Sequence, residues 1–239
     1  MTTNQHAVAI MQPYFWPYLG YFQLMHNCDQ FVLYDNIQYT KKGWINRNRI
    51  AENGSDVYVS IPLKKASDYS LVVDREISAE FDTSAPKLRR KIVNAYRRAP
   101  FIDDGISIVD ECLQFEPRNL FLFLKHSLQV IQNHLGITTA LTVASKVAAD
   151  HNAKGQQKVL NICDTCHASK YINPIGGLHL YERQAFEQHD ITLQFLQPQI
   201  APYKQHGCSV FLANLSIIDV LMSCGIEMTR QKLNECIIE

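Results

Sequence analysis

The chain has 239 residues, and its 23 Lys and Arg balance 23 Asp and Glu, so the formal net charge is zero. A neutral chain has no overall field that would draw it to DNA or to an anionic membrane. Neither an apolar signal-peptide core nor an uncharged run near the roughly 18 residues of a membrane span is present, so we expect a cytoplasmic protein without membrane insertion and with seven reduced cysteines.

The first elements predict a β-α-β unit. Residues 7–11 form a short apolar run typical of a strand buried on both faces, and Gln12-Pro13 ends it. The loop over residues 13–20 holds four aromatic residues, two prolines and a glycine, which favours a preset turn. A helical pattern begins near Tyr21, and residues 31–34 predict a second strand.

Two loops therefore follow the carboxyl ends of neighbouring parallel strands, where ligands of α/β proteins bind. The second loop, residues 35–49, mixes cations, amides and aromatic side chains. We place the active site between the two loops. The residues expected to bind substrate in or beside them are Gln12, Tyr14, Trp16, Tyr18, Gly20, Tyr21, Lys41, Trp44, Asn46 and Asn48.

The rest of the chain predicts an α/β fold. Residues 56–63 read as a third strand, and helices are expected at 83–99, 103–115 and 117–134, a helical block over about residues 82–135. Residues 68–77 are read as a strand or a loop. Strands at 139–144, 170–172 and 192–196 then alternate with helices at 155–168 and 180–189. We expect one domain over residues 1–239, a three-layer Rossmann-like parallel sheet shared by residues 1–63 and 139–200.

The last helix is expected over residues 211–224. Ser216 and Asp219 have the spacing of a capping box, and Gly225 is expected to end the helix. At the earlier helix 83–99, a hydroxyl of Thr83 or Ser84, or Asp82, is the expected cap.

Five segments, in chain order, resemble the WbqC-like protein family: MQPYFWPYLGYFQL, DQFVLYDNIQYTKKGWINRNRI, NAYRRAPF, YINPIGGLHLY and FLANLSIIDVLMSCG. The similarity covers about residues 8–225. Proteins of this family are met in bacterial O-antigen and other surface-polysaccharide gene clusters. The resemblance thus implies a role in lipopolysaccharide or related polysaccharide biosynthesis.

Tyr18-Leu19-Gly20-Tyr21 stands where adenylyl-transferring α/β enzymes of the HUP class carry His-x-Gly-His. Tyrosine donates a hydrogen bond but is uncharged at neutral pH, so stabilising a phosphate would fall to Lys41, Lys42 and Arg47. A second glycine turn, Asn173 with Gly176 and Gly177, follows a predicted strand at the same edge; it is read equally as a tight connection or as a phosphate or carboxylate site.

Other signatures are excluded or open. Cys163 and Cys166-His167 have the spacing of a haem attachment site but lie in a predicted helix. The histidines do not have the spacing of zinc ligands, so we predict no metal site. The sequence contains neither a Walker loop nor a Gly-x-Gly-x-x-Gly loop for nucleotides. Lys146, Lys154 and Lys158 are read as solvated lysines rather than as phosphate ligands.

The leading hypothesis is a transferase that adds an aminoacyl group, such as glycyl, to the amino group of a nucleotide-linked amino sugar. Asp35 is the candidate base, Lys42 and Arg47 hold phosphates, and ATP with magnesium is a candidate cofactor. The alternative is a non-catalytic nucleotide-sugar-binding protein or a glycosyltransferase partner. An RNA-binding module is disfavoured by the neutral charge. The oligomeric state stays open, with a homodimer as one option.

Overall fold

Six strands form a sheet in the order β5-β2-β1-β6-β7-β8 in the computed structural model, which describes residues 6–239. They are β1 (Ala7–Met11), β2 (Gln30–Leu33), β5 (Ala140–Val143), β6 (Lys170–Pro174), β7 (Thr192–Pro198) and β8 (Cys236–Ile238). Neighbouring strands are parallel except β7 and β8, which are antiparallel. If the six strands are numbered by their order in the chain, their order across the sheet is 3-2-1-4-5-6, which is the arrangement of Rossmann-like sheets.

The strands β1 and β2 are buried on both faces, which explains their continuous apolar sequences. In β1, Ala7 and Ala9 point to one hydrophobic cluster, whereas Val8 and Ile10 point to a second cluster on the opposite face. This alternation follows from the two-residue period of a strand.

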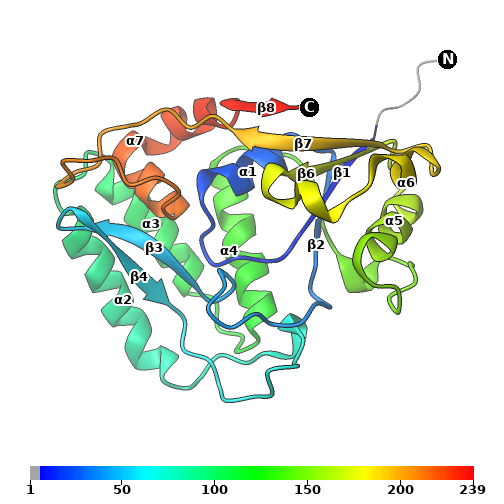
Figure 1. Cartoon of the computed structure of the whole chain (residues 1–239). Coiled ribbons are helices and arrows are strands. Elements are labelled where there is room, and N and C mark those ends of the chain that lie inside the picture. The colour runs from blue at the N-terminus through cyan, green and yellow to red at the C-terminus, as the bar shows by residue number, and fades with distance from the viewer. Residues whose placement is uncertain (1–5) are drawn as a thin grey trace.

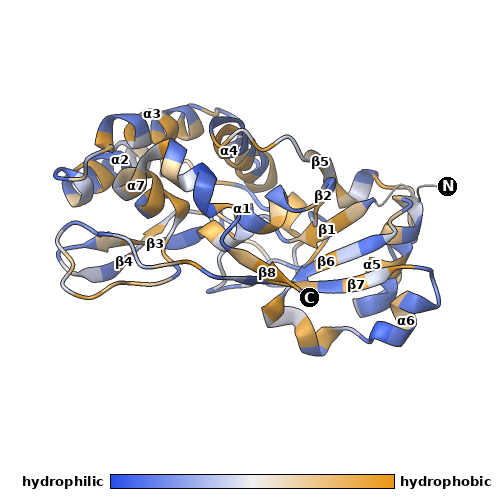
Figure 2. Ribbon diagram, turned by 90° about the horizontal axis from the view of Figure 1, so that it is seen from above, coloured by the Kyte–Doolittle hydropathy of each residue, from blue (hydrophilic) through white to orange (hydrophobic). Residues whose placement is uncertain are grey.

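Helices cover both faces of the sheet, giving the three layers (Figure 1). On one face the cluster includes side chains of α1 (Leu19–His26), α4 (Leu120–His134) and α7 (Ile217–Lys232). On the other face it includes side chains of α5 (Gly155–Thr165) and α6 (Arg183–Glu187). Figure 2 shows α5 and α6 on the side of the sheet opposite to α4.

Two further helices, α2 (Phe81–Tyr96) and α3 (Ile102–Leu113), precede α4 along the chain. The α3 helix packs against α2, α4 and α7, and α2 also contacts β3. Phe123 of α4 lies 5.5 Å from the ring of Phe81 and 6.3 Å from that of Phe15, measured between ring centroids. The helices at residues 81–134 therefore share one apolar core with the loop that follows β1.

The predicted third strand does not join the main sheet. Residues Ser55–Ser60 form β4, which pairs antiparallel with β3 (Arg47–Glu52) in a separate two-stranded hairpin. Asn53 and Gly54 connect them with φ of 52° and 80°, as a two-residue hairpin turn requires. The expectation that residues 1–63 all contribute to the parallel sheet was thus wrong, because this Asn-Gly turn reverses the chain.

The ends of two helices can be compared with those expected from the sequence. The N-cap of α2 is Glu80, which makes no side-chain cap bond, so the expected cap by Asp82, Thr83 or Ser84 was wrong. In α7, Gly225 has a non-helical φ of 75°, so the first helical segment ends there as expected, and a second segment follows it to Lys232. Residues 68–77, expected as a strand or a loop, hold a short 3₁₀ turn, Val72–Asp74, and isolated β-bridges at Leu71, Glu76 and Ile77.

The expected capping box at α7 is only half present. Ser216 is the N-cap, and its hydroxyl accepts a hydrogen bond from the Ile218 N–H. The Asp219 carboxylate does not return to Ser216; it accepts hydrogen bonds from side chains of residues 96, 203 and 205. None of the helices in residues 6–239 is long and apolar enough to cross a membrane.

Candidate functional site

The direction of the crossovers reverses between β1 and β6. From β1 the chain passes through α1 to β2 on one side, and from β6 it passes through α6 to β7 on the other. The loops after such a pair of strands separate and leave a crevice at the carboxyl edge of the sheet. Here those segments are residues 12–18 after β1 and the 3₁₀ turn Ile175–Leu180 after β6.

The loop over residues 12–18 is fixed by contacts of buried groups on its protein side. The Trp16 ring is fully buried and stacks on Phe15, with 4.1 Å between ring centroids. The carbonyl oxygen of Trp16 accepts hydrogen bonds from Asn48 Nδ2 at 2.8 Å and from the Ser216 hydroxyl at 2.8 Å. Trp16 therefore supports the loop, and its ring does not face solvent.

This loop and the second predicted loop lie in contact. The Phe15 N–H donates to the carbonyl oxygen of Trp44 at 3.0 Å, and Asn48 Nδ2 also donates to the carbonyl oxygen of Phe15 at 3.0 Å. Asn48 is buried, and its Oδ1 accepts from the Arg49 N–H. The Nδ2 group of Asn48 thus links the two loops through hydrogen bonds.

Arginine and aromatic side chains alternate on the β3–β4 hairpin. Trp44 and Tyr58 stack with 6.5 Å between ring centroids. The Arg47 guanidinium lies 4.6 Å from the Tyr58 ring centroid, and that of Arg49 lies 5.4 Å from the Trp44 ring. Arg49 also pairs with Asp56 at 2.9 Å. These contacts orient Trp44 and Arg49 towards the crevice.

A cleft of about 570 Å³ lies where these segments meet, and we call it the switch-point cleft. Its lining residues come from the loop after β1, the hairpin, the ends of β6 and β7 and the segment before α7. They are Tyr14, Pro17, Tyr18, Trp44, Asn48, Arg49, Ile175, Gly176, Gln197, Pro198 and Asn214. Its volume is in the range of sites for small molecules, about 300–1,000 Å³.

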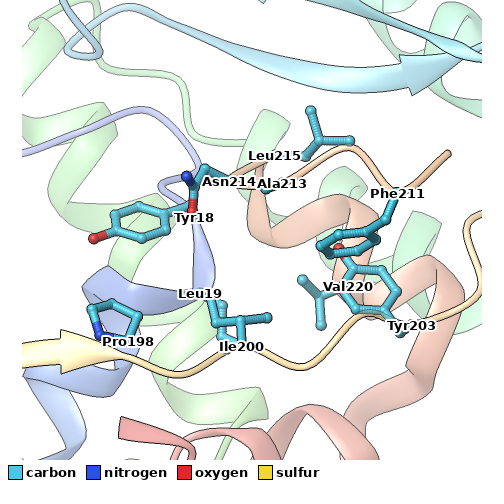
Figure 3. Close-up of a pocket in the computed structure, with 10 residues that line it drawn as sticks. All are labelled: Tyr18, Leu19, Pro198, Ile200, Tyr203, Phe211, Ala213, Asn214, Leu215 and Val220. Atoms are coloured by element: carbon cyan, nitrogen blue, oxygen red, sulfur yellow. The ribbon is translucent and has the colours of Figure 1, made fainter. Parts of the chain in front are cut away.

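A smaller, apolar pocket of about 160 Å³ adjoins this cleft and shares Tyr18, Pro198 and Asn214 with it. Figure 3 shows the Tyr18 ring at one end of this side pocket and the rings of Tyr203 and Phe211 at the other. Together the two spaces offer ring faces and apolar walls around one cation, Arg49.

The hydroxyls of Tyr14 and Tyr18 are available to a ligand. Burial raises the pKa of both phenols above the usual value, and the neighbouring Tyr18 raises that of Tyr14 further. Both therefore stay protonated at neutral pH and can donate a hydrogen bond. The side chain of Tyr18 rests on Gly20, where an added Cβ would lie 2.4 Å from the Tyr18 ring.

The structure brings together five of the predicted site residues as lining of the switch-point cleft: Tyr14, Tyr18, Trp44, Asn48 and Gly176. Six lining residues are not among the predicted site residues, and three of these are polar: Arg49, Gln197 and Asn214. A signal for Gln197 existed, because Gln197-Pro198 ends a parallel strand just as Gln12-Pro13 does. For Asn214 the sequence held no comparable signal.

Other predicted residues lie beside this cleft or below it. Gln12 offers its carbonyl oxygen to the hydroxyl of the buried Tyr21 at 3.0 Å. Asn46 accepts from the Tyr39 hydroxyl at 2.7 Å. Asn173 is buried, and its amide nitrogen lies where a Cβ on Gly177 would stand, so Gly177 is required for this packing.

The predicted cations and base lie outside the lining. Lys41 pairs with Asp68 at 2.5 Å on the surface. Arg47 donates to the carbonyl oxygens of Gly43 and Lys42. Asp35 is buried, and its Oδ1 accepts from the Ser145 N–H at 2.9 Å, on the side of β2 that faces β5.

The fold and cleft thus define an α/β protein with a mostly parallel sheet and a ligand-sized crevice at its switch point. The model of the WbqC-like protein family matches residues 12–231, and the chain belongs to this family. The uncharacterized protein Rv1507c of Mycobacterium tuberculosis is 26% identical over 222 residues, which cover 92% of this chain and 94% of that protein. The comparison with solved structures gave no match.

Proposed function

We propose that the switch-point cleft binds a nucleotide-linked amino sugar and that the protein tailors this sugar for a bacterial surface polysaccharide. The observation that carries the proposal is the lining of the cleft, in which Tyr14, Tyr18 and Trp44 stand beside Arg49. It lies at the sheet edge where doubly wound folds bind nucleotides. The polysaccharide pathway is the one that the resemblance to WbqC-like proteins implies.

Each part of such a ligand has a matching group in the lining. Rings of Trp44 and Tyr18 would stack on the base or on the sugar. Arg49 and the tyrosine hydroxyls would bind the phosphates, because Arg49 lines the cleft whereas Lys41, Lys42 and Arg47 do not. Gln197 and Asn214 would hydrogen-bond the sugar hydroxyls.

The reaction we propose is aminoacyl transfer. Glycine and ATP form glycyl adenylate and pyrophosphate; the sugar amine then attacks the glycyl carbonyl, an amide bond forms, the bond to AMP breaks and the amine loses a proton. In this scheme ATP would bind at the carboxyl edge of the sheet as it does in HUP-class enzymes, with Tyr18 and Gly20 at the position of their His-x-Gly residues. Hydroxyls of Tyr14 and Tyr18 would donate to the oxygen that gains negative charge. We assign no base, since Asp35 does not line the cleft.

A second candidate is a protein that binds the nucleotide-sugar without catalysis, or that serves a glycosyltransferase as a partner. It is favoured by one observation: the described residues that line the cleft include no Asp, Glu, His, Lys or Cys. The lining therefore offers no pair of nucleophile and base.

Binding is tested by calorimetry with UDP-glucosamine. We expect saturable binding that Arg49→Gln weakens at least about tenfold, the loss of one charge-assisted hydrogen bond. Arg89→Gln is the matched control, since Arg89 is also a surface arginine in an ion pair, with Asp110, and lies on α2 away from the cleft. Equal affinities of the two variants would contradict the assignment of the cleft.

Catalysis is tested separately by mass spectrometry after incubation with ATP, glycine, magnesium and UDP-glucosamine. A glycyl amide of the sugar together with AMP is the result that the transferase predicts. Binding of UDP-glucosamine without any new product would favour the non-catalytic candidate.

A further inference from the structure

A second cleft, of about 530 Å³, opens at the same edge of the sheet on the face that carries α5. Its walls include Tyr34 and residues 36–38 after β2, residues 151–156 at the start of α5, and Leu180 with Tyr181. The 3₁₀ turn after β6 separates the two clefts, because Ile175 and Gly176 line the switch-point cleft at one end of the turn and Leu180 lines the second cleft at the other. We call it the α5 cleft.

A buried ammonium lines the α5 cleft. Lys158 is only 7% exposed, and its Nζ makes one long hydrogen bond, 3.4 Å, to the carbonyl oxygen of Asn36. It also lies 4.9 Å from the ring centroid of Tyr34. Within the part of the chain that the structure describes, Lys158 has no carboxylate at ion-pair distance. Two of its three N–H donors are thus free.

Burial lowers the pKa of Lys158, and the negative charge of Asp35 acts in the opposite direction. Asp35 is the acidic group that faces Lys158, and it is itself buried and bonded to the Ser145 N–H. An ammonium with two free N–H donors in a cleft is stabilised when an anion binds to it. The exposed Lys154 lines the same cleft and adds a second positive charge.

The remaining polar groups describe the ligand further. His151 Nε2 lies 2.9 Å from the Val147 carbonyl oxygen, so it carries a proton, and Nδ1 then accepts from Asn36 Nδ2 at 3.0 Å. This pairing leaves Asn36 Oδ1 as a buried acceptor without a partner among the described residues. Ile37 and the rings of Tyr34 and Tyr181 supply apolar walls.

We propose that the α5 cleft binds a small ring compound that carries a phosphate or carboxylate group, with this anionic group on Lys158 and Lys154 and its ring against Ile37, Tyr34 and Tyr181. The proposal does not rest on the function proposed for the switch-point cleft. If that function holds, the α5 cleft is a second substrate site of the same protein.

Pyridoxal 5′-phosphate is a suitable probe, since it is a ring compound with a phosphate and an aldehyde that condenses with an uncharged lysine amine. Borohydride reduction then fixes the imine, and peptide mapping reports the labelled lysines. We expect Lys154 or Lys158 to be labelled at least about tenfold faster than the exposed Lys146, which lies outside the cleft, as one charge-assisted hydrogen bond would give. Pyridoxal without the phosphate should label Lys154 no faster than Lys146; Lys158 is left out of this comparison, because its lowered pKa by itself favours condensation.

Two protection arms identify the anionic group. Slower labelling in the presence of inorganic phosphate assigns a phosphate, and slower labelling with benzoate assigns a carboxylate. The Lys158→Met variant should lose the protection of Lys154, whereas Arg49→Gln in the other cleft should keep it. If Lys158→Met does not fold, the protection of the unaltered protein decides alone. Equal labelling of Lys146, Lys154 and Lys158, or labelling that neither anion slows, would overturn the proposal.

Discussion

A buried carboxylate, Asp219 of α7, ties three separate segments together. Its Oδ1 accepts from the Tyr96 hydroxyl at 2.8 Å, and its Oδ2 accepts from the Tyr203 hydroxyl at 2.6 Å and from Gln205 Nε2 at 2.8 Å. The residue is 0% exposed. Asp219→Ala would remove three hydrogen bonds, although Gln205 keeps a bond to the carbonyl oxygen of Leu212.

We predict that Asp219→Ala lowers the free energy of unfolding by roughly 2–4 kcal/mol, because each buried donor left unsatisfied costs about 1–3 kcal/mol and Gln205 is partly compensated. Tyr203→Phe, which removes one donor and keeps the carboxylate, should cost less. Urea denaturation measures both. A loss below about 1 kcal/mol for Asp219→Ala would refute the claim that this network holds the segments together.

The same carboxylate predicts a pH effect of defined sign. Burial raises the pKa of Asp219 above its ordinary value, against the opposing hydrogen bonds from Tyr203, Gln205 and Tyr96. Between the unfolded and the raised folded pKa the native state binds more protons, so this group's contribution to stability falls as pH rises through that window. Asp219→Asn should therefore be more destabilising at mildly acidic pH than at pH 7. A stability difference between variant and unaltered protein that is larger at pH 7 would contradict the raised pKa.

Three further predictions concern the core and the loop after β1. Gly20→Ala should displace the Tyr18 ring, from which the new Cβ would lie 2.4 Å, and weaken nucleotide-sugar binding in calorimetry while the protein stays folded; unchanged affinity would remove Tyr18 from the site. Asn48→Ala should lower the unfolding free energy by about 1–3 kcal/mol in urea, because it removes the side-chain donor to the Phe15 carbonyl and one of the two donors to the Trp16 carbonyl, which keeps that of Ser216; a neutral effect would contradict this role. Phe123→Ala should lower the free energy of unfolding by about 3–5 kcal/mol. Because Phe123 packs on Phe15, the variant should still unfold in a single transition by both fluorescence and circular dichroism. Two separated transitions would show that helices 81–134 and the sheet unfold independently.

The sequence predicted the parallel strands well because burial leaves a clear pattern. The apolar runs in β1 and β2 are continuous since neighbours such as Val8 and Ala9 pack into opposite clusters. The strand β3 was missed because Arg47–Glu52 reads as polar: its arginines stack on exposed aromatic rings, and only Ile50 and Ala51 are buried apolar residues. The Asn53-Gly54 turn was a usable signal for this hairpin.

The sequence pointed to the loop after β1 and to the polar loop over residues 35–49, and both contribute to the lining of the switch-point cleft, but it did not identify the cation of that lining. The sequence places Lys41, Lys42, Arg47 and Arg49 in one loop without telling which of them faces the crevice. Pairing within the hairpin decides this: Arg47 stacks on Tyr58, and Arg49 stacks on Trp44, which lines the cleft. Such tertiary pairing has no one-dimensional signature.

The central claim is that the switch-point cleft binds a nucleotide-linked sugar, and Trp44 gives the most direct measurement of it. The chain has two tryptophans: Trp16 is fully buried, and Trp44 is 38% exposed in the cleft lining. Titration with UDP-glucosamine should change the tryptophan fluorescence saturably in the unaltered protein and leave it unchanged in Trp44→Phe. No change in the unaltered protein at millimolar ligand, or the same change in Trp44→Phe, would contradict the account.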